Sequence, residues 1–531
     1  MTRLRVGEAV VDLLARHYGV DVVFGIPGVH NIELYRGLHR SGVRAVSPRH
    51  EQGAGFMADG WSIVTGRPGV CTLISGPGLT NALTPMAQAF HDSRPMLVLA
   101  ATTDTGALGR RFGPLHDLDD QACLARTVTA FSETVLDPTE LPALIARAWD
   151  VFTSQRPRPV HLAIPTDVLE RLVDPFEPAA PLARRPAPLA AELDRAADLL
   201  RAARAPGATG DVALIVGGGA IDAGPSVLAL AERLDAVVVL TGNAKGVVAS
   251  SHPRCAGNVL GIRAVQEAIE AMGTVVVIGS EVSDTDLYNG GHPLAFAGRV
   301  LRIDLDVEQL PRRMVPDATV VADARLALDG LTTRLADLAT AEPSRGAHLA
   351  AAWRELGAPA PALAPWVEAI AATLTDDTIV ALDSTQLAYA AHVALPCARP
   401  RSWLAPYGLG TLGCALPMAI GAKLAAPARP VLALAGDGGW LFTVAEMAVA
   451  VDEDLDLVLV LWDNRGYAQI RQSFDDANAA RMGVDVTSAD PAAIARGFGW
   501  RTAHVTTPDA LTATIFAARV AGGPHMVVVR A

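Results

Sequence analysis

The sequence predicts an α/β protein made of three doubly wound domains with parallel sheets. Short runs of Val, Ile and Leu alternate along the chain with stretches whose apolar residues recur at helical spacing. Near-continuous apolar runs indicate strands that are buried on both faces, as in parallel sheets covered by helices. The chain has 531 residues, which exceeds the size of one domain. Two segments rich in Pro and Ala, 176–192 and 338–365, are interpreted as linkers between three units.

We expect these units at residues 1–178, 190–338 and 360–531, each with several apolar runs typical of strands. In the first unit the runs are DVVFGI (21–26), VRAVSP (43–48), VCTLIS (70–75), PMLVLAA (95–101) and PVHLAIP (159–165). In the second they are DVALIVGGG (211–219), DAVVVLTG (235–242), TVVVIGS (274–280) and RVLRIDLD (299–306). In the third they are TIVALDS (378–384), PVLALAGDGG (430–439), LDLVLVLWDN (455–464) and HMVVVRA (525–531).

Composition and charge narrow the class of protein. Half of the residues are hydrophobic and 19% are charged, a balance that supports large buried sheets and excludes a disordered chain. The net charge of −12 argues against nucleic acid and anionic membranes as partners. No apolar run reaches the ~20 residues of a membrane span, and residues 1–20 have the spacing of an amphipathic helix and not of a signal peptide. The five cysteines show no CxxC or metal-binding spacing, so we expect reduced thiols in a cytoplasmic enzyme.

The most informative motif is GDGG, which contains Asp437, Gly438 and Gly439, followed by DNRG, which contains Asn464 and Gly466. The segment between them begins with helical spacing and ends as an apolar strand, so the two turns are expected to lie close together. Asp437, the amide oxygen of Asn464 and the carbonyl of Gly466 form an all-oxygen site suited to a hard cation such as Mg²⁺. Gly438 and Gly439 let a phosphate approach the start of the following helix. The motif therefore predicts a magnesium-diphosphate clamp.

This clamp resembles the signature of thiamine diphosphate enzymes, with Asp463 in place of the first Asn of their NN pair. The three units are similar in organisation to the acetolactate synthase/pyruvate decarboxylase superfamily, which has a pyrimidine-binding, a central and a diphosphate-binding domain. PRHEQGAGFMADG, ISGPGLTN, LHDLDDQ, RPRPVHLAIPTDV and GTLGCALP are most similar to the 5-guanidino-2-oxopentanoate (2-ketoarginine) decarboxylases of that superfamily. The resemblance implies thiamine diphosphate and Mg²⁺ as cofactors.

Three residues are expected to act on the rings of the cofactor. Glu51 opens a helical stretch, and the resemblance implies that its carboxyl group protonates the pyrimidine. The alternative for Glu51 is a helix-terminal acid favoured by the helix dipole. The resemblance further implies that Leu412, in GTLG, holds the two rings in a bent conformation and that the carbonyl of Gly410 meets the pyrimidine amine. Core packing is the alternative for Leu412.

Two further segments are candidates for contact with a cofactor. Gln386, in DSTQ, follows a strand and resembles the family segment that contacts the diphosphate, whereas Ser384 and Thr385 are equally typical of a helix cap. The GGG at 217–219 lacks the spaced GxGxxG of a dinucleotide site, so FAD is not expected.

Histidines are the candidates for contact with substrate. His116, in LHDLDDQ, is expected to hydrogen-bond a carboxylate or relay a proton, the alternative being a surface-loop histidine without a role. Acetolactate synthases have Gln at this place. Ala130 stands where many of them have Lys, and Ile74 stands where benzoylformate decarboxylases have His, so neither pattern transfers. His30 is a further candidate, near where other members line the active-site mouth.

The resemblance implies decarboxylation of a 2-oxo acid to an aldehyde and CO₂, the alternative being acetolactate synthase-like carboligation. A catalytically silent assembly subunit is a different class, against which the intact Glu51 and Asp437 argue. In the family these two residues come from different chains, so a homodimer or homotetramer is expected. A guanidinium tail on the substrate would need a carboxylate near the pocket mouth. The candidates are Asp117, Asp119, Asp120, Asp284 and Asp286.

Overall fold

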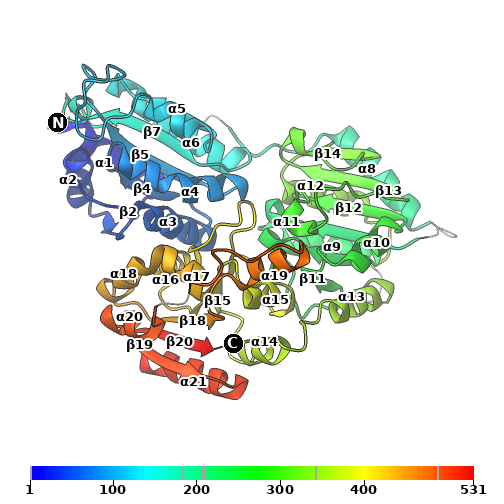
Figure 1. Cartoon of the computed structure of the whole chain (residues 1–531). Coiled ribbons are helices and arrows are strands. Elements are labelled where there is room, and N and C mark those ends of the chain that lie inside the picture. Colours follow the sequence, from blue (N-terminus) through cyan, green and yellow to red (C-terminus); the bar gives the residue numbers. More distant parts are fainter. Residues whose placement is uncertain (1–2, 181–182, 206–209, 341–343, 487–488, 531) are drawn as a thin grey trace.

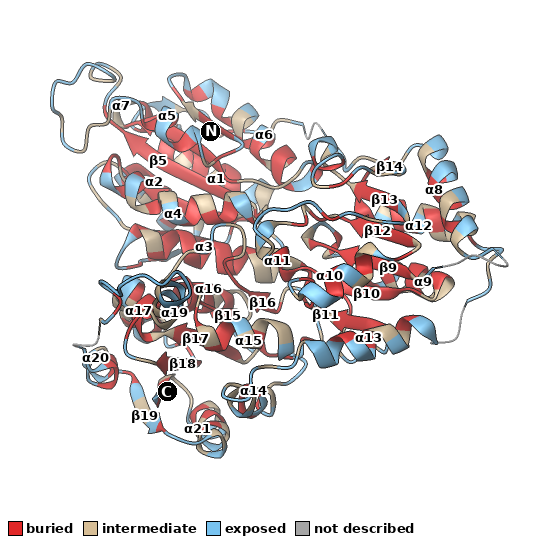
Figure 2. Ribbon diagram, turned by 45° about the vertical axis from the view of Figure 1, so that its right-hand side comes forward, coloured by how far each residue is buried: buried red, intermediate tan, exposed pale blue. Residues whose placement is uncertain are grey.

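The computed structural model describes residues 3–180, 183–205, 210–340, 344–486 and 489–530 and contains three α/β units, each built on a parallel six-stranded sheet (Figure 1). The predicted fold class is therefore confirmed. In the described residues, strands and inward helix faces are buried and outer helix faces are exposed (Figure 2). Residues 181–182 of the first predicted linker and 341–343 of the second lie outside the described residues. None of the helices described here is long and apolar enough to span a bilayer.

The first unit has the strand order β3-β2-β4-β5-β7-β6. Its strands are β1 Leu4–Arg5, β2 Val22–Gly25, β3 Arg44–Val46, β4 Gly69–Leu73, β5 Met96–Thr102, β6 Phe131–Thr134, β7 Val160–Pro165 and β8 Leu172–Val173. Its helices are α1 Val6–Tyr18, α2 Ile32–Ser41, α3 Glu51–Thr65, α4 Pro77–His91, α5 Gln121–Arg126, α6 Leu141–Ser154 and α7 Thr166–Leu169. β1 pairs with β8 in a separate antiparallel ribbon, so the predicted N-terminal helix begins only at Val6.

The second unit has the order β11-β10-β9-β12-β13-β14. Its strands are β9 Val212–Val216, β10 Val237–Leu240, β11 Cys255–Gly257, β12 Thr274–Ile278, β13 Arg299–Asp304 and β14 Ala318–Val321. Its helices are α8 Ala190–Ala203, α9 Gly224–Leu234, α10 Arg263–Glu270, α11 Asp284–Leu287, α12 Ala324–Arg334 and α13 Arg345–Leu356. The linker interpretation of 338–365 is wrong where α13 lies, because Ala350 and Trp353 of this helix are buried in the core of the second unit.

The third unit has the order β16-β15-β17-β18-β20-β19. Its strands are β15 Ile379–Leu382, β16 Trp403–Leu404, β17 Val431–Gly436, β18 Leu457–Asp463, β19 Arg501–Val505 and β20 Pro524–Arg530. Its helices are α14 Ala364–Ala371, α15 Gln386–Ala394, α16 Ala415–Ala425, α17 Asp437–Trp440, α18 Met447–Asp452, α19 Ala468–Asp476, α20 Pro491–Gly497 and α21 Pro508–Ala521. The helix predicted after GDGG is interrupted by a 3-10 segment, Leu441–Glu446, because Thr443 has a non-helical φ of −133°.

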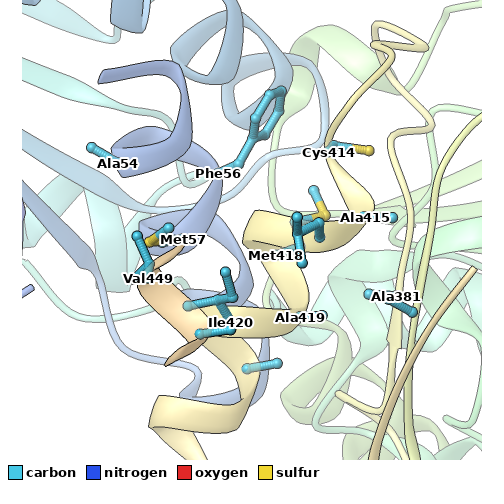
Figure 3. Packing of buried hydrophobic residues seen from close by; sticks show 14 of the residues in the cluster. Ala54, Phe56, Met57, Ala381, Cys414, Ala415, Met418, Ala419, Ile420 and Val449 are labelled. Atoms are coloured by element: carbon cyan, nitrogen blue, oxygen red, sulfur yellow. The ribbon is translucent and has the colours of Figure 1, made fainter. Parts of the chain in front are cut away.

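The first and third units are held together by the crossing of α3 with α16. Phe56 and Met57 of α3 share one buried cluster with Met418 and Ile420 of α16 (Figure 3). The helices approach closely because they cross at glycines. A Cβ on Gly60 of α3 would lie 2.2 Å from the carbonyl oxygen of Met418, and one on Gly421 of α16 would lie 2.0 Å from that of Met57. The helix that begins at Glu51 is thereby fixed against the third unit of its own chain.

Candidate active site

The residues predicted to hold the cofactor lie around one cavity of about 760 Å³ between the second and third units. All eight predicted cofactor and metal positions line it: Gly410, Leu412, Gln386, Asp437, Gly438, Gly439, Asn464 and Gly466. They converge because β15, β17 and β18 are neighbouring parallel strands whose carboxyl ends lie at the same edge of the sheet. The predicted clustering of these residues is thus what the structure shows, while their contacts with a cofactor stay a prediction.

Asp437, Asn464 and Gly466 bring oxygen atoms together at the end of β17 and β18. Oδ2 of Asp437 accepts a hydrogen bond of 2.8 Å from the N–H of Gly466. One terminal position of the Asn464 amide lies 3.2 Å from Oδ1 of Asp437 and 2.9 Å from the carbonyl oxygen of Gly466. The Asn464 amide can be turned in two ways. With its nitrogen at this position it donates to both oxygens, and with its oxygen at this position three oxygens face one another. The two distances from the amide, 3.2 and 2.9 Å, match the spacing of about 3 Å between adjacent oxygens of an octahedral Mg²⁺ shell with metal–oxygen distances of about 2.1 Å.

The backbone around this oxygen cluster requires glycine. Gly466 has a φ of +131°, and a Cβ there would lie 2.2 Å from the carbonyl oxygen of Val484. Gly438 packs against the ring of Tyr467, 2.6 Å from where its Cβ would be. Asp463 does not line the cavity; Nη2 of Arg530 donates to its Oδ2 at 3.4 Å. Asn464 is therefore the member of the Asp-Asn pair that faces the site.

Asp383 holds the glycine-rich turns in place. Its two oxygens accept hydrogen bonds from the backbone N–H groups of Ser384 and Gly413, each at 2.8 Å. Burial raises the pKa of Asp383 to about 6 despite these bonds. A Cβ on Gly439 would lie 3.0 Å from its Oδ2. Asp383 therefore ties the turn before α16 to the end of β15 and lies against Gly439 of the turn after β17. Thr385, not Ser384, is the N-cap residue of α15, without a capping side-chain bond.

Glu51 and His116 lie on the first unit and do not line this cavity. Glu51 begins α3 as predicted, is 8% exposed and accepts a 2.9 Å hydrogen bond from the amide of Asn81. His116 follows β5 in a loop, has a φ of +62°, and accepts a hydrogen bond from Ser75 at its carbonyl. Its ring centroid lies 5.2 Å from that of His30. Burial, followed by the neighbouring His116, lowers the pKa of His30.

These first-unit residues follow β2, β3 and β5, whose carboxyl ends share one sheet edge. Glu51 lies there at the first position of α3, and the two histidines lie in loops. Nothing in residues 3–180 contributes to the lining of the 760 Å³ cavity. One chain therefore carries two separate groups of candidate site residues. One group lines the cavity between the second and third units, and the other lies at the sheet edge of the first unit.

Several residues in these two groups were not predicted from the sequence. Tyr389 lines the cavity one helical turn after Gln386, so helical spacing was a usable signal. Tyr467 directly follows the DNRG motif. Glu446 had no signal, because its carboxylate meets the N–H groups of Arg49 and His50 nearly 400 positions earlier in the chain, at 3.0–3.2 Å.

Glu446 should make folding stability depend on pH. Its side chain is fully buried, and burial raises its pKa to about 7 from 4.5, opposed by the N–H groups of Arg49 and His50 and assisted by Glu51. A carboxyl with a raised folded-state pKa stabilises the fold fully below pH 4.5 and loses that contribution as the pH rises through 7.

We expect the free energy of unfolding of the wild type to fall relative to Glu446→Gln between pH 5 and 8, by at most about 3 kcal/mol. Denaturant unfolding at several pH values measures this difference. Glu355→Gln, on the exposed side of α13, is the matched control and should track the wild type. Parallel wild-type and Glu446→Gln curves would contradict the assignment.

Comparison with known proteins gives the same division of the chain. Three models of the thiamine pyrophosphate enzyme family match it: the N-terminal TPP binding domain at residues 4–123, the central domain at 193–331 and the C-terminal TPP binding domain at 383–529. These matches fall on the three structural units in order.

Among individual proteins, the chain is 45% identical to the probable 2-ketoarginine decarboxylase AruI of Pseudomonas aeruginosa, over 93% of this chain and 88% of that protein. It is 31% identical to the large subunit of acetolactate synthase isozyme 1 of Escherichia coli, over 88% and 82% of the two chains. It is 32% identical to the acetolactate synthase large subunit of Corynebacterium glutamicum, over 88% and 76%.

Proposed function

The chain belongs to the thiamine pyrophosphate enzyme family, and we propose that it is a Mg²⁺-dependent decarboxylase that converts 5-guanidino-2-oxopentanoate to an aldehyde and CO₂. The single observation that carries the choice of substrate is the 45% identity to a probable 2-ketoarginine decarboxylase over nearly the whole length of both chains. The acetolactate synthases are 31–32% identical, so carboligation is the second candidate.

Thiamine diphosphate, when bound, supplies a carbon that adds to the carbonyl of a 2-oxo acid and takes up the electron pair that CO₂ leaves behind. We assign the Mg²⁺ to Asp437, Asn464 and Gly466, because the Asn464 amide lies 3.2 Å from Oδ1 of Asp437 and 2.9 Å from the carbonyl oxygen of Gly466 and would turn its oxygen toward a bound metal. Gly438 and Gly439, at the start of α17, fit the diphosphate because they have no side chain of their own to cover their N–H groups. Gln386, Gly410 and Leu412, which share the cavity, complete the proposed cofactor site.

Glu51 is proposed to hold a proton at N1′ of the pyrimidine, and it must reach that atom from another chain. The support is that α3 is fixed against the third unit of its own chain, while the cofactor cavity has no lining residue from 3–180. A second chain would bring the edge carrying Glu51 and His116 to the open cavity. The minimal active unit is therefore a homodimer, and two dimers would form a homotetramer.

His116 is proposed to meet the substrate at the mouth of the composite site. Its Nδ1 and that of His30 have no hydrogen-bond partner within the part of the chain that the structure describes. A buried ring nitrogen without a partner lacks a hydrogen bond, which the substrate carboxylate or a proton passed to the product would supply. We further propose that residues 1–178, 190–338 and 360–531 are the pyrimidine-binding, central and diphosphate-binding domains, with α13 packed on the central one.

The proposed activity is tested with a panel of 2-oxo acids and detection of CO₂. Enzyme freed of cofactor and metal should release CO₂ from 5-guanidino-2-oxopentanoate only after both thiamine diphosphate and Mg²⁺ are restored. Product analysis then separates an aldehyde from a carboligation product. Release of CO₂ without added cofactor, or an acyloin as the main product, would overturn the proposal.

A further inference from the structure

Asp286 lies in the same cavity as the proposed cofactor clamp but comes from the second unit. It belongs to the short helix α11, while Gln386, Asp437 and Asn464 of the clamp side come from the third unit. The cavity therefore extends from the carboxyl ends of β15, β17 and β18 to a carboxylate on the opposite domain. A substrate whose 2-oxo acid end lies at Gly410 and Leu412, the residues assigned to the cofactor rings, has the remaining space of the cavity, which includes α11, for its tail.

The carboxylate of Asp286 is held in position by neutral donors. Its Oδ1 accepts a 3.0 Å hydrogen bond from the N–H of Gly242, and its Oδ2 accepts bonds from the hydroxyl and N–H of Ser283 at 2.8 and 3.1 Å. No Lys, Arg or His of the described chain forms an ion pair with it. Burial raises its pKa. A fixed carboxylate that lacks a cationic partner is a strong acceptor for a cationic ligand.

Aromatic rings stand beside this carboxylate. Tyr288, Tyr389 and Tyr407 line the cavity with Asp286. The hydroxyl of Tyr407 is fixed by His392 at 2.6 Å and by the indole N–H of Trp403 at 2.8 Å. Tyrosine ring faces attract planar cations such as guanidinium. The backbone of Gly242 connects the two features, because it donates to Asp286 and a Cβ on it would lie 2.6 Å from the Tyr407 ring.

The charges that line the cavity are of one sign. Its lining contains Asp286, Asp383 and Asp437 and, among the residues described, neither lysine nor arginine. Asp383 is occupied by two backbone N–H groups, and Asp437 belongs to the clamp. Asp286 is therefore the carboxylate left for a ligand tail, and the cavity disfavours an anionic tail.

The other acids weighed from the sequence have different positions. Asp119 is paired with Arg111 at 2.8 Å, Asp120 caps α5 through the N–H of Cys123, and Asp284 accepts from the N–H of Gly291. None of these three lines the cavity, and neither does Asp117, which lies beside His116 on the first unit.

We infer that Asp286, with the tyrosines around it, binds the guanidinium group of the substrate and so determines specificity for a cationic tail. This inference rests on the proposed function. The guanidinium donates one N–H group to the remaining lone pair on Oδ1 of Asp286 while its plane lies against a tyrosine ring.

The test compares two substrates of similar length, 5-guanidino-2-oxopentanoate and 2-oxooctanoate, whose tail is uncharged. In Asp286→Asn the ratio of their kcat/KM values should fall by about 10- to 100-fold in favour of the acid with the uncharged tail. Asp284→Asn, two positions away and outside the cavity, is the matched control and should keep the wild-type ratio. An unchanged ratio in Asp286→Asn, or a comparable fall in Asp117→Asn, would overturn the inference.

A binding measurement separates this inference from the proposed reaction. Agmatine carries a guanidinium group but no oxo acid, so its affinity for the enzyme loaded with thiamine diphosphate and Mg²⁺ does not depend on turnover. Calorimetry should show weaker agmatine binding to Asp286→Asn than to wild type and to Asp284→Asn, each protein being measured below its own thermal unfolding temperature. If wild-type enzyme binds agmatine through Asp286 but releases no CO₂ from any 2-oxo acid, the proposed reaction fails and the guanidinium site stands. Equal agmatine affinity in all three proteins refutes the site even if the reaction is correct.

Discussion

Replacing Glu51 with glutamine should lower kcat by about 100- to 10,000-fold while thiamine diphosphate still binds. Glutamine preserves the shape of the side chain and can still meet the amide of Asn81, but it has no acidic proton to place at N1′ of the pyrimidine. The fold should be kept, because Glu51 forms no ion pair with any cation in the described residues.

Two measurements check this expectation. The rate of hydrogen–deuterium exchange at C2 of bound thiamine diphosphate should fall with turnover, and a cofactor titration should give nearly the wild-type affinity. Asn81→Ala is a useful comparison, because it removes a hydrogen bond to Glu51 and leaves the acid, so its effect should be smaller. Near-wild-type C2 exchange in Glu51→Gln would show that another group protonates the pyrimidine.

Asp437→Ala should weaken the binding of thiamine diphosphate in the presence of Mg²⁺ by more than about 100-fold, because it removes the charged member of the oxygen cluster. The same change removes the acceptor for the N–H of Gly466, so the turn after β18 also loses a support. Asn464→Ala should act in the same direction but less strongly, since a neutral ligand is lost.

Titration of the metal-depleted enzyme with thiamine diphosphate and Mg²⁺ together measures this effect. Asp463→Asn is the matched control, because Asp463 faces Arg530 and not the cavity, and it should keep most of the affinity. Undiminished cofactor affinity in Asp437→Ala would refute the clamp.

The two variants together test the division of the site between chains. A dimer of one Glu51→Gln chain and one Asp437→Ala chain contains one site with both native residues and one site with neither. Random exchange of subunits should therefore restore about a quarter of wild-type activity. No recovery, after exchange has been demonstrated with labelled subunits, would mean that each site is built within one chain.

The sequence predicted the inner strands of all three sheets and missed most of the edge strands. β6, β11, β14, β16 and β19 were not expected, and each lies at an edge of its sheet. β16 has only two residues and β11 only three, too short for an apolar run to stand out. Edge strands pair on one side only, so their sequences need not be continuously apolar; β19, with the sequence RTAHV, is partly exposed along most of its length.

The residues of the candidate site also fall into those that the sequence predicted and those that it did not. The clamp residues lie in two short motifs at neighbouring strand ends, so their spacing along the sequence was enough to place them in one cavity. Glu446 meets Arg49 and His50 through packing between the third and first units, which no local pattern reports. Asp286 was one of five acids that the sequence offered, and only its place in the cavity distinguishes it from the other four. α13 was taken for a linker because Pro and Ala flank it, although its buried Trp353 is bound into the core of the central unit.

The central claim is that this protein decarboxylates a 2-oxo acid with a guanidinium tail and does not join two smaller acids. The most direct test measures, for one preparation with saturating cofactor and Mg²⁺, kcat/KM for conversion of 5-guanidino-2-oxopentanoate to 4-guanidinobutanal and kcat/KM for conversion of pyruvate to acetolactate. The account predicts that the first value exceeds the second by at least about 100-fold, because only the guanidino acid satisfies Asp286. Faster formation of acetolactate from pyruvate would contradict it and establish the carboligase function instead.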